Sequence, residues 1–147
     1  MGIEQIAVAG EILAIIVRGN FSDLGVHFLT PNGFSQQLGY IQHPAGKLIQ
    51  PHIHKPVERA VNFTQEVLFV RRGKIRIDFY SNHQEYIESR ILEAGDIVLL
   101  ASAGHGFEVL EEVELFEVKQ GPYVESEDKV RFEGISSDQA VVKDEGD

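Results

Sequence analysis

The stretch EVLFVRRGKIRIDFY, residues 66–80, constrains the fold most, because apolar and polar side chains alternate along it with a period of two. Ile75, Ile77 and Phe79 are separated by charged residues, as in a strand that buries one face. The polar residues 71–73 end in a glycine and divide the stretch. The pattern therefore predicts two strands, 67–70 and 74–80, joined by a tight turn.

Short apolar runs bounded by glycine, proline or acidic residues recur along the rest of the chain. The predicted strands before residue 66 cover residues 11–19, 25–30, 36–43 and 47–54. No apolar period of 3.6 residues continues through three helical turns, which argues against long helices. About nine short strands, with turn signals every 8–12 residues, predict an all-β sandwich or barrel with little helix.

Length and charge exclude several classes of protein. A chain of 147 residues suits one domain. Its net charge of −10, without a basic cluster, argues against partners that are nucleic acids or anionic membranes. The N-terminal apolar stretch lacks a basic region and is interrupted by Glu11, so we expect a cytoplasmic protein rather than an exported one. Because cysteine is absent, any metal must be held by imidazole, carboxylate or carbonyl groups.

Two histidines and two glutamates between residues 48 and 73 form the main candidate for chemistry. On a strand, His52 and His54 would point to the same side, about 6–7 Å apart, which suits one metal ion. The same geometry suits two histidines on the solvent-exposed face of a strand. Glu58 and Glu66 are the carboxylates near enough in sequence to join them.

These residues resemble the two motifs of the cupin superfamily. Gly46, His52 and His54 match the opening of the first motif, G-x5-H-x-H-x(3,4)-E-x6-G, and Glu66 with Gly73 matches its end. The segment GDIVLLASAGHGFEV resembles the second motif, G-x5-P-x-G-x2-H, from Gly95 to a histidine at 105, which comes one residue early. Eleven residues separate His54 from Glu66, which is a longer spacing than the motif has.

The resemblance implies a jelly-roll barrel, also called a double-stranded β-helix, over residues 1–120, with the motifs at 46–73 and 95–105. It further implies one mononuclear metal site with His52, His54, Glu66 and His105 as ligands. Nitrogen-rich ligands of this kind suit one divalent transition metal, namely Fe, Mn, Ni, Co, Cu or Zn.

Glu66 is the better choice of carboxylate. Glu58 satisfies the motif spacing after the histidines, but no apolar strand follows it, and residue 65 is glutamine where the motif has glycine. Glu66 begins the strongest strand pattern and has Gly73 at the expected distance. Residues 55–65 are then an inserted loop. The candidate pocket residues are Gln50, Phe79, Phe107, His43 and Arg59.

The reaction is left open by the sequence. The resemblance implies an enzyme of the metal-dependent oxygenase or isomerase type that acts on a small molecule, with Glu66 as a ligand or a base. One alternative is a non-catalytic cupin that binds or senses a small molecule or a metal. Another is a metal-free isomerase or epimerase of nucleotide-linked sugars, which would use histidine acid–base chemistry.

Two further expectations concern the ends of the chain. Residues 121–147 contain three basic and eight acidic residues, a net charge of 3 − 8 = −5. We expect this acidic extension to be partly docked and then frayed. The run ILAIIV, residues 12–17, has no polar alternation, so both of its faces need cover, and we expect a homodimer that covers the outer face.

Overall fold

The computed structural model describes residues 2–144, and these residues divide into two compact units. Of the described residues, 2–21 together with 63–144 form the first unit, and Ser22–Asn62 forms the second. The strands of the first unit are β1 (Ile3–Val8), β2 (Glu11–Val17), β5 (Glu66–Tyr80), β6 (Tyr86–Glu93), β7 (Ile97–Leu100) and β8 (Gly104–Lys119). Its helical turns are α1 (Glu125–Asp128) and a 3-10 turn at Ser137–Gln139.

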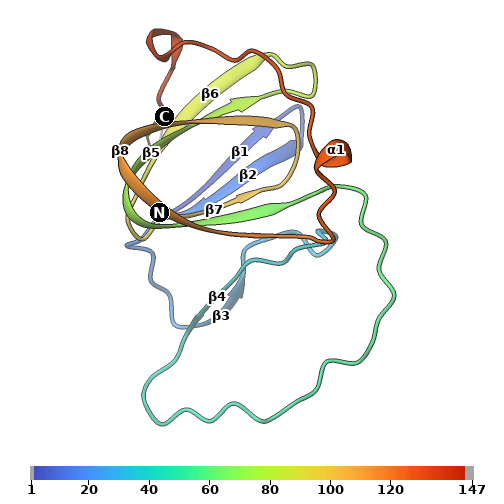
Figure 1. The fold of residues 1–147 in the computed structure, drawn as a ribbon. Helices are drawn as coiled ribbons and strands as arrows, with labels where there is room; N and C mark the ends of the chain where they lie inside the picture. The colour runs from blue at the N-terminus through green and yellow to red at the C-terminus, as the bar shows by residue number, and fades with distance from the viewer. Residues whose placement is uncertain (1, 145–147) are drawn as a thin grey trace. The chain divides into compact units, whose positions relative to one another are not determined.

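The first unit is one curled antiparallel sheet, a half-barrel with almost no helix (Figure 1). The strand order is β1-β2-β7-β5-β6, and β8 pairs with β5 along nearly its whole length. The all-β class expected from the sequence is therefore confirmed. The curled sheet is compatible with a cupin-like fold.

Residues 66–80 form one strand rather than two, so the predicted turn at residues 71–73 is wrong. β5 runs without interruption through this region and stays paired with β8, and the register shifts three times between Val70 and Ile75. Such bulges bend a strand without ending it. Gly73 lies at the bend with φ +88°, in the left-handed region that glycine adopts without steric cost.

The core of the half-barrel is apolar and includes strand β2. Leu13, Ala14, Ile15, Ile16 and Val17 are all buried, so both faces of this strand are covered within the chain. The sequence argument for a homodimer through residues 12–17 therefore loses its basis. A dimer would have to form through a different surface of the chain.

Four charged residues lie together, partly or fully buried, where β1 approaches β6. Glu4 accepts hydrogen bonds from both Arg18 and Arg90, and Arg90 also donates to Glu88. Glu4, Arg90 and Glu88 are buried, so each charge needs an opposite charge beside it to offset the cost of its removal from water. Motif spacing does not predict this network, because its members are far apart in the sequence.

The C-terminal extension is docked on β6 as far as residue 143. The Ser89 N–H donates to the Val141 carbonyl at 2.9 Å, and the Lys143 N–H donates to the Ser89 carbonyl at 3.0 Å. These contacts lie in the segment that we expected to be frayed. Residues 145–147, the end of that segment, lie outside the described residues.

The second unit contains a two-stranded hairpin, β3 (Gly25–Phe28) with β4 (Gly39–Gln42). Residues 47–54, predicted as a strand, lie outside any strand, so this prediction is wrong for the described chain. Pro51 removes one backbone donor, and no neighbouring strand pairs with this segment among the described residues. None of the helices described here is long and apolar enough to cross a membrane.

Candidate functional site

Glu66 is held at the beginning of β5, on the face that it shares with the core. The preceding residue, Gln65, is buried, and its N–H donates to the Gln120 side chain at 2.7 Å. Glu66 alternates with Leu68 and Val70, which are both in the core. Its side chain is 14% exposed. The predicted inward orientation of Glu66 thus agrees with its position on the strand.

His105 lies beside Glu66 although the two residues are at opposite ends of the β5–β8 ladder. In that ladder Glu66 pairs with Lys119, whereas His105 pairs with Phe79. The sheet curls enough to bring Glu66 Oε2 and His105 Nε2 to 3.8 Å. This distance is too long for a direct hydrogen bond between the two side chains.

Glu117 is a second carboxylate at this site, and sequence reasoning missed it. It pairs with Leu68 across the ladder, so it projects from the same face as Glu66. Burial raises the pKa of Glu66, and a side-chain hydrogen bond and charge repulsion from Glu117 raise that pKa further. The carboxyl group of Glu66 therefore keeps its proton to a higher pH than an exposed glutamate does.

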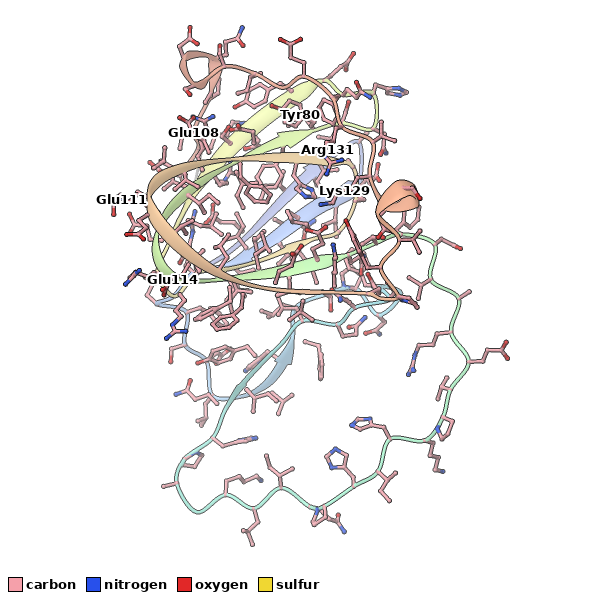
Figure 2. All side chains as sticks on the ribbon, in the orientation of Figure 1. Tyr80, Glu108, Glu111, Glu114, Lys129 and Arg131 are labelled. Atoms are coloured by element: carbon pink, nitrogen blue, oxygen red, sulfur yellow. The ribbon has the colours of Figure 1, made fainter. Side chains whose placement is uncertain are left out.

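Cationic side chains from β8 and the C-terminal extension complete the surroundings. The charges of Lys119 and Lys129 oppose the rise in the pKa of Glu66. Burial lowers the pKa of His105, and the positive charge of Lys129 lowers it further. Lys129 and Arg131 extend from the C-terminal segment toward the interior of the curled sheet (Figure 2). The site therefore combines a neutral imidazole, two carboxyl groups and nearby cations.

The predicted pocket residues differ in how exposed they are. Phe79 is fully buried in the core, and Phe107 is 42% exposed, with its ring 5.4 Å from that of His105. Phe79 is therefore a core residue, and Phe107 presents apolar surface beside His105. Gln50 and Arg59 are exposed in the second unit, and His43 there is half-buried.

The other two predicted metal ligands belong to the second unit. The rings of His52 and His54 are edge to face with centroids 5.1 Å apart, and both side chains are exposed. The four predicted ligands thus form two separate close pairs, one within each unit. Within residues 2–144, no group of three or more His, Asp or Glu side chains is close enough to hold a metal.

The donor atoms that do come together fit a divalent transition metal in their chemistry. A neutral imidazole and a carboxylate are ordinary ligands for such ions. Burial and repulsion from Glu117 raise the pKa of Glu66, and a cation bound there would relieve that repulsion.

One groove in the described part of the first unit contains none of these residues. It has a volume of about 560 Å³ and is lined in part by Arg18, Lys74, Glu93 and Asp96. Four of its charged side chains form ion pairs, since Arg18 contacts Asp96 at 3.0 Å and Lys74 contacts Glu93 at 3.1 Å. These charges are therefore satisfied within the chain.

Glu117 and Lys129 could not have been identified from motif spacing. Glu117 reaches the site through the β5–β8 register, which depends on three bulges. Lys129 reaches it from an extension whose acidic composition gave no sign of a role near the site. No protein-family model, no curated protein and no solved structure matches this chain.

Proposed function

We propose that this chain is a metal-dependent cupin that acts on a small molecule by oxygenase- or isomerase-type chemistry. Its mononuclear site would use His52, His54, Glu66 and His105 as ligands. The observation that supports this most is the 3.8 Å distance between Glu66 and His105, which were selected from separate motifs. A bound divalent transition metal would supply a Lewis acid or a redox centre.

The residues around the pair favour a small, apolar molecule with an anionic group. Phe107 and Val109 are partly exposed on the side of β8 that faces the core, where an apolar body can pack. Lys119 and Lys129 place positive charge near the two carboxyl groups and would attract an anion. Glu66 can hold a proton at a carboxyl oxygen, because its pKa is raised by burial and by Glu117.

A metal-free acid–base enzyme is the second candidate, and one observation favours it. Burial moves the pKa of Glu66 upward and that of His105 downward. Two neighbouring titratable groups with opposite shifts are typical of an acid and a base that work together. In this alternative, Glu66 would donate a proton and His105 would accept one.

Elemental analysis of protein purified without a metal-affinity tag tests the first proposal directly. We expect about one transition metal per chain, as a single four-ligand site requires. An oxygen-uptake screen of the loaded protein then separates oxygenase from isomerase chemistry. Activity that survives complete removal of metal by a chelator would replace the first proposal with the second. A metal or ligand bound without turnover would indicate the sensing alternative.

A further inference from the structure

The segment of residues 44–62, here called the arm, is exposed along its whole length. Leu48, Ile49 and Ile53 are 89%, 64% and 91% exposed, and Val57 and Val61 are also exposed. From residue 48 onward, no described backbone group in the arm forms a hydrogen bond with another backbone group. A soluble chain rarely leaves so many apolar side chains and backbone groups without protein cover.

The first unit has an uncovered surface of its own along β8. This strand pairs with β5 alone among the described strands, so its other edge is open. Phe107 and Val109 pair with the buried Ile77 and Ile75, yet they are 42% and 57% exposed. An open edge beside exposed apolar residues is a ready site for an added strand.

The arm and β8 have opposite charges. The arm contains Lys47, Lys55 and Arg59 against Glu58, a net charge of 3 − 1 = +2 in a chain whose total is −10. Residues 104–119 contain five glutamates and one lysine, a net charge of 1 − 5 = −4. Opposite charge favours association of the arm with β8. Two β8 edges would instead repel one another.

The length of the arm suits an exchange between two copies of the chain. Nineteen extended residues reach about 60 Å, which exceeds the roughly 50 Å span of a 16-residue strand. In a two-fold dimer, each copy would cover the open edge of the other. One symmetric interaction would then cover both the arm and the open edge of β8.

We propose that the arm of one copy docks along β8 of a second copy, and that His52 and His54 of the first copy complete the metal site formed by Glu66 and His105 of the second. The metal part of this inference rests on the proposed function. The docking part rests on the exposure, the open edge and the charges of the arm and β8. The dimer is thus formed through the arm and not through residues 12–17.

Cross-linking of isotopically mixed chains tests the docking without any metal. Unlabelled and 15N-labelled chains are unfolded together, refolded at equal amounts and treated with a lysine cross-linker. The diagnostic product joins Lys55 of the arm to Lys119 of β8. At statistical exchange, about half of this product should join a light peptide to a heavy one. Products that are only light–light or only heavy–heavy would mean that each arm docks on its own chain and would overturn the inference.

Light scattering on matched variants provides a second test. The unmutated chain should have the mass of a dimer at micromolar concentration. Ile49→Asp/Ile53→Asp should be a folded monomer by circular dichroism, because aspartates cannot be buried on β8. The control is Val26→Asp, an exposed apolar position outside the arm, which should remain a dimer. A dimer that survives the arm substitutions would overturn the inference.

Mixed dimers then test the shared metal site. One chain carries His52→Ala/His54→Ala, and the other carries Glu66→Gln/His105→Ala. Neither variant alone should bind metal, whereas a refolded mixture should regain about one metal per mixed dimer, because one of its two sites is intact. Exchange of arms without regained metal would overturn the shared site but not the docking, and absence of metal from the unmutated chain as well would overturn the proposed function. Metal in the unmutated chain without exchange would overturn the docking and leave the proposed function standing.

Discussion

Glu66 Oε2 and His105 Nε2 lie 3.8 Å apart at opposite ends of one β5–β8 ladder. In a flat sheet, the 14 residue steps between the two ends would span about 45 Å. The bulges between Val70 and Ile75 bend both strands and bring the two side chains together. The candidate site is therefore a consequence of the curl of the sheet.

The choice of carboxylate predicts different effects of two conservative substitutions. Glu66→Gln should weaken metal binding tenfold or more, because it removes a charged ligand beside His105. Glu58→Gln is the matched control and should change metal affinity little, since Glu58 is exposed in the arm. Isothermal titration with the metal identified by elemental analysis measures both. A larger loss for Glu58→Gln would show that the wrong glutamate has been assigned to the motif.

Stability of the metal-free protein should depend on pH through Glu66. Its pKa is raised above the ordinary value of 4.5, mainly by burial. The resulting stability is fully present below pH 4.5 and is lost as the pH rises through the raised pKa. Glu66→Gln should remove this loss, so the variant should gain stability relative to the unmutated chain as pH rises. Urea unfolding at a series of pH values measures the difference.

His105 should make the stability of the metal-free protein depend on pH in the opposite direction. Its pKa is lowered below the ordinary value of 6.5, mainly by burial. Its contribution is therefore present above pH 6.5 and is lost as the pH falls through the lowered pKa. His105→Gln should flatten the acid side of the stability profile. An unchanged acid limb in this variant would mean that His105 is fully solvated.

The docked C-terminal segment should stabilise the sheet. Removal of residues 136–147 deletes both backbone hydrogen bonds to Ser89 and uncovers this fully buried residue. We expect a loss of about 1–3 kcal/mol in the free energy of unfolding. Removal of residues 144–147 alone is the control, because it keeps Val141 and Lys143, and it should cost less than about 0.5 kcal/mol. Equal effects of the two truncations would contradict the docking.

The sequence predicted the all-β class and a strand at residues 11–19, observed as Glu11–Val17, because both follow from local apolar patterns. It also selected Glu66 and His105, which the structure brings together. It failed at Gly73, where the pattern predicted a turn, because a glycine with positive φ serves a bulge as well as a turn. It could not find Glu117, since cross-strand neighbours depend on a register that the bulges shift. Periodicity reports which face a residue occupies but not how far a strand bends.

Gly73 should be the most sensitive glycine in the sheet, because it combines positive φ with a close backbone approach. A Cβ at this position would lie 1.9 Å from the Glu112 carbonyl oxygen on β8, so the backbone would have to move. Gly10 provides a matched control, since its φ is +82° and nothing lies within 4 Å of its would-be Cβ.

Gly10→Ala should therefore cost only the left-handed strain, roughly 1–2 kcal/mol. Gly73→Ala should cost more than about 4 kcal/mol, the range of severe steric or packing defects. Chemical denaturation of both variants measures the difference. Because the bend at Gly73 brings Glu66 to His105, any folded Gly73→Ala protein should also lose the perturbed titration of His105, which NMR can follow. Similar losses of stability in the two variants, with the His105 titration unchanged, would show that the bend does not need glycine.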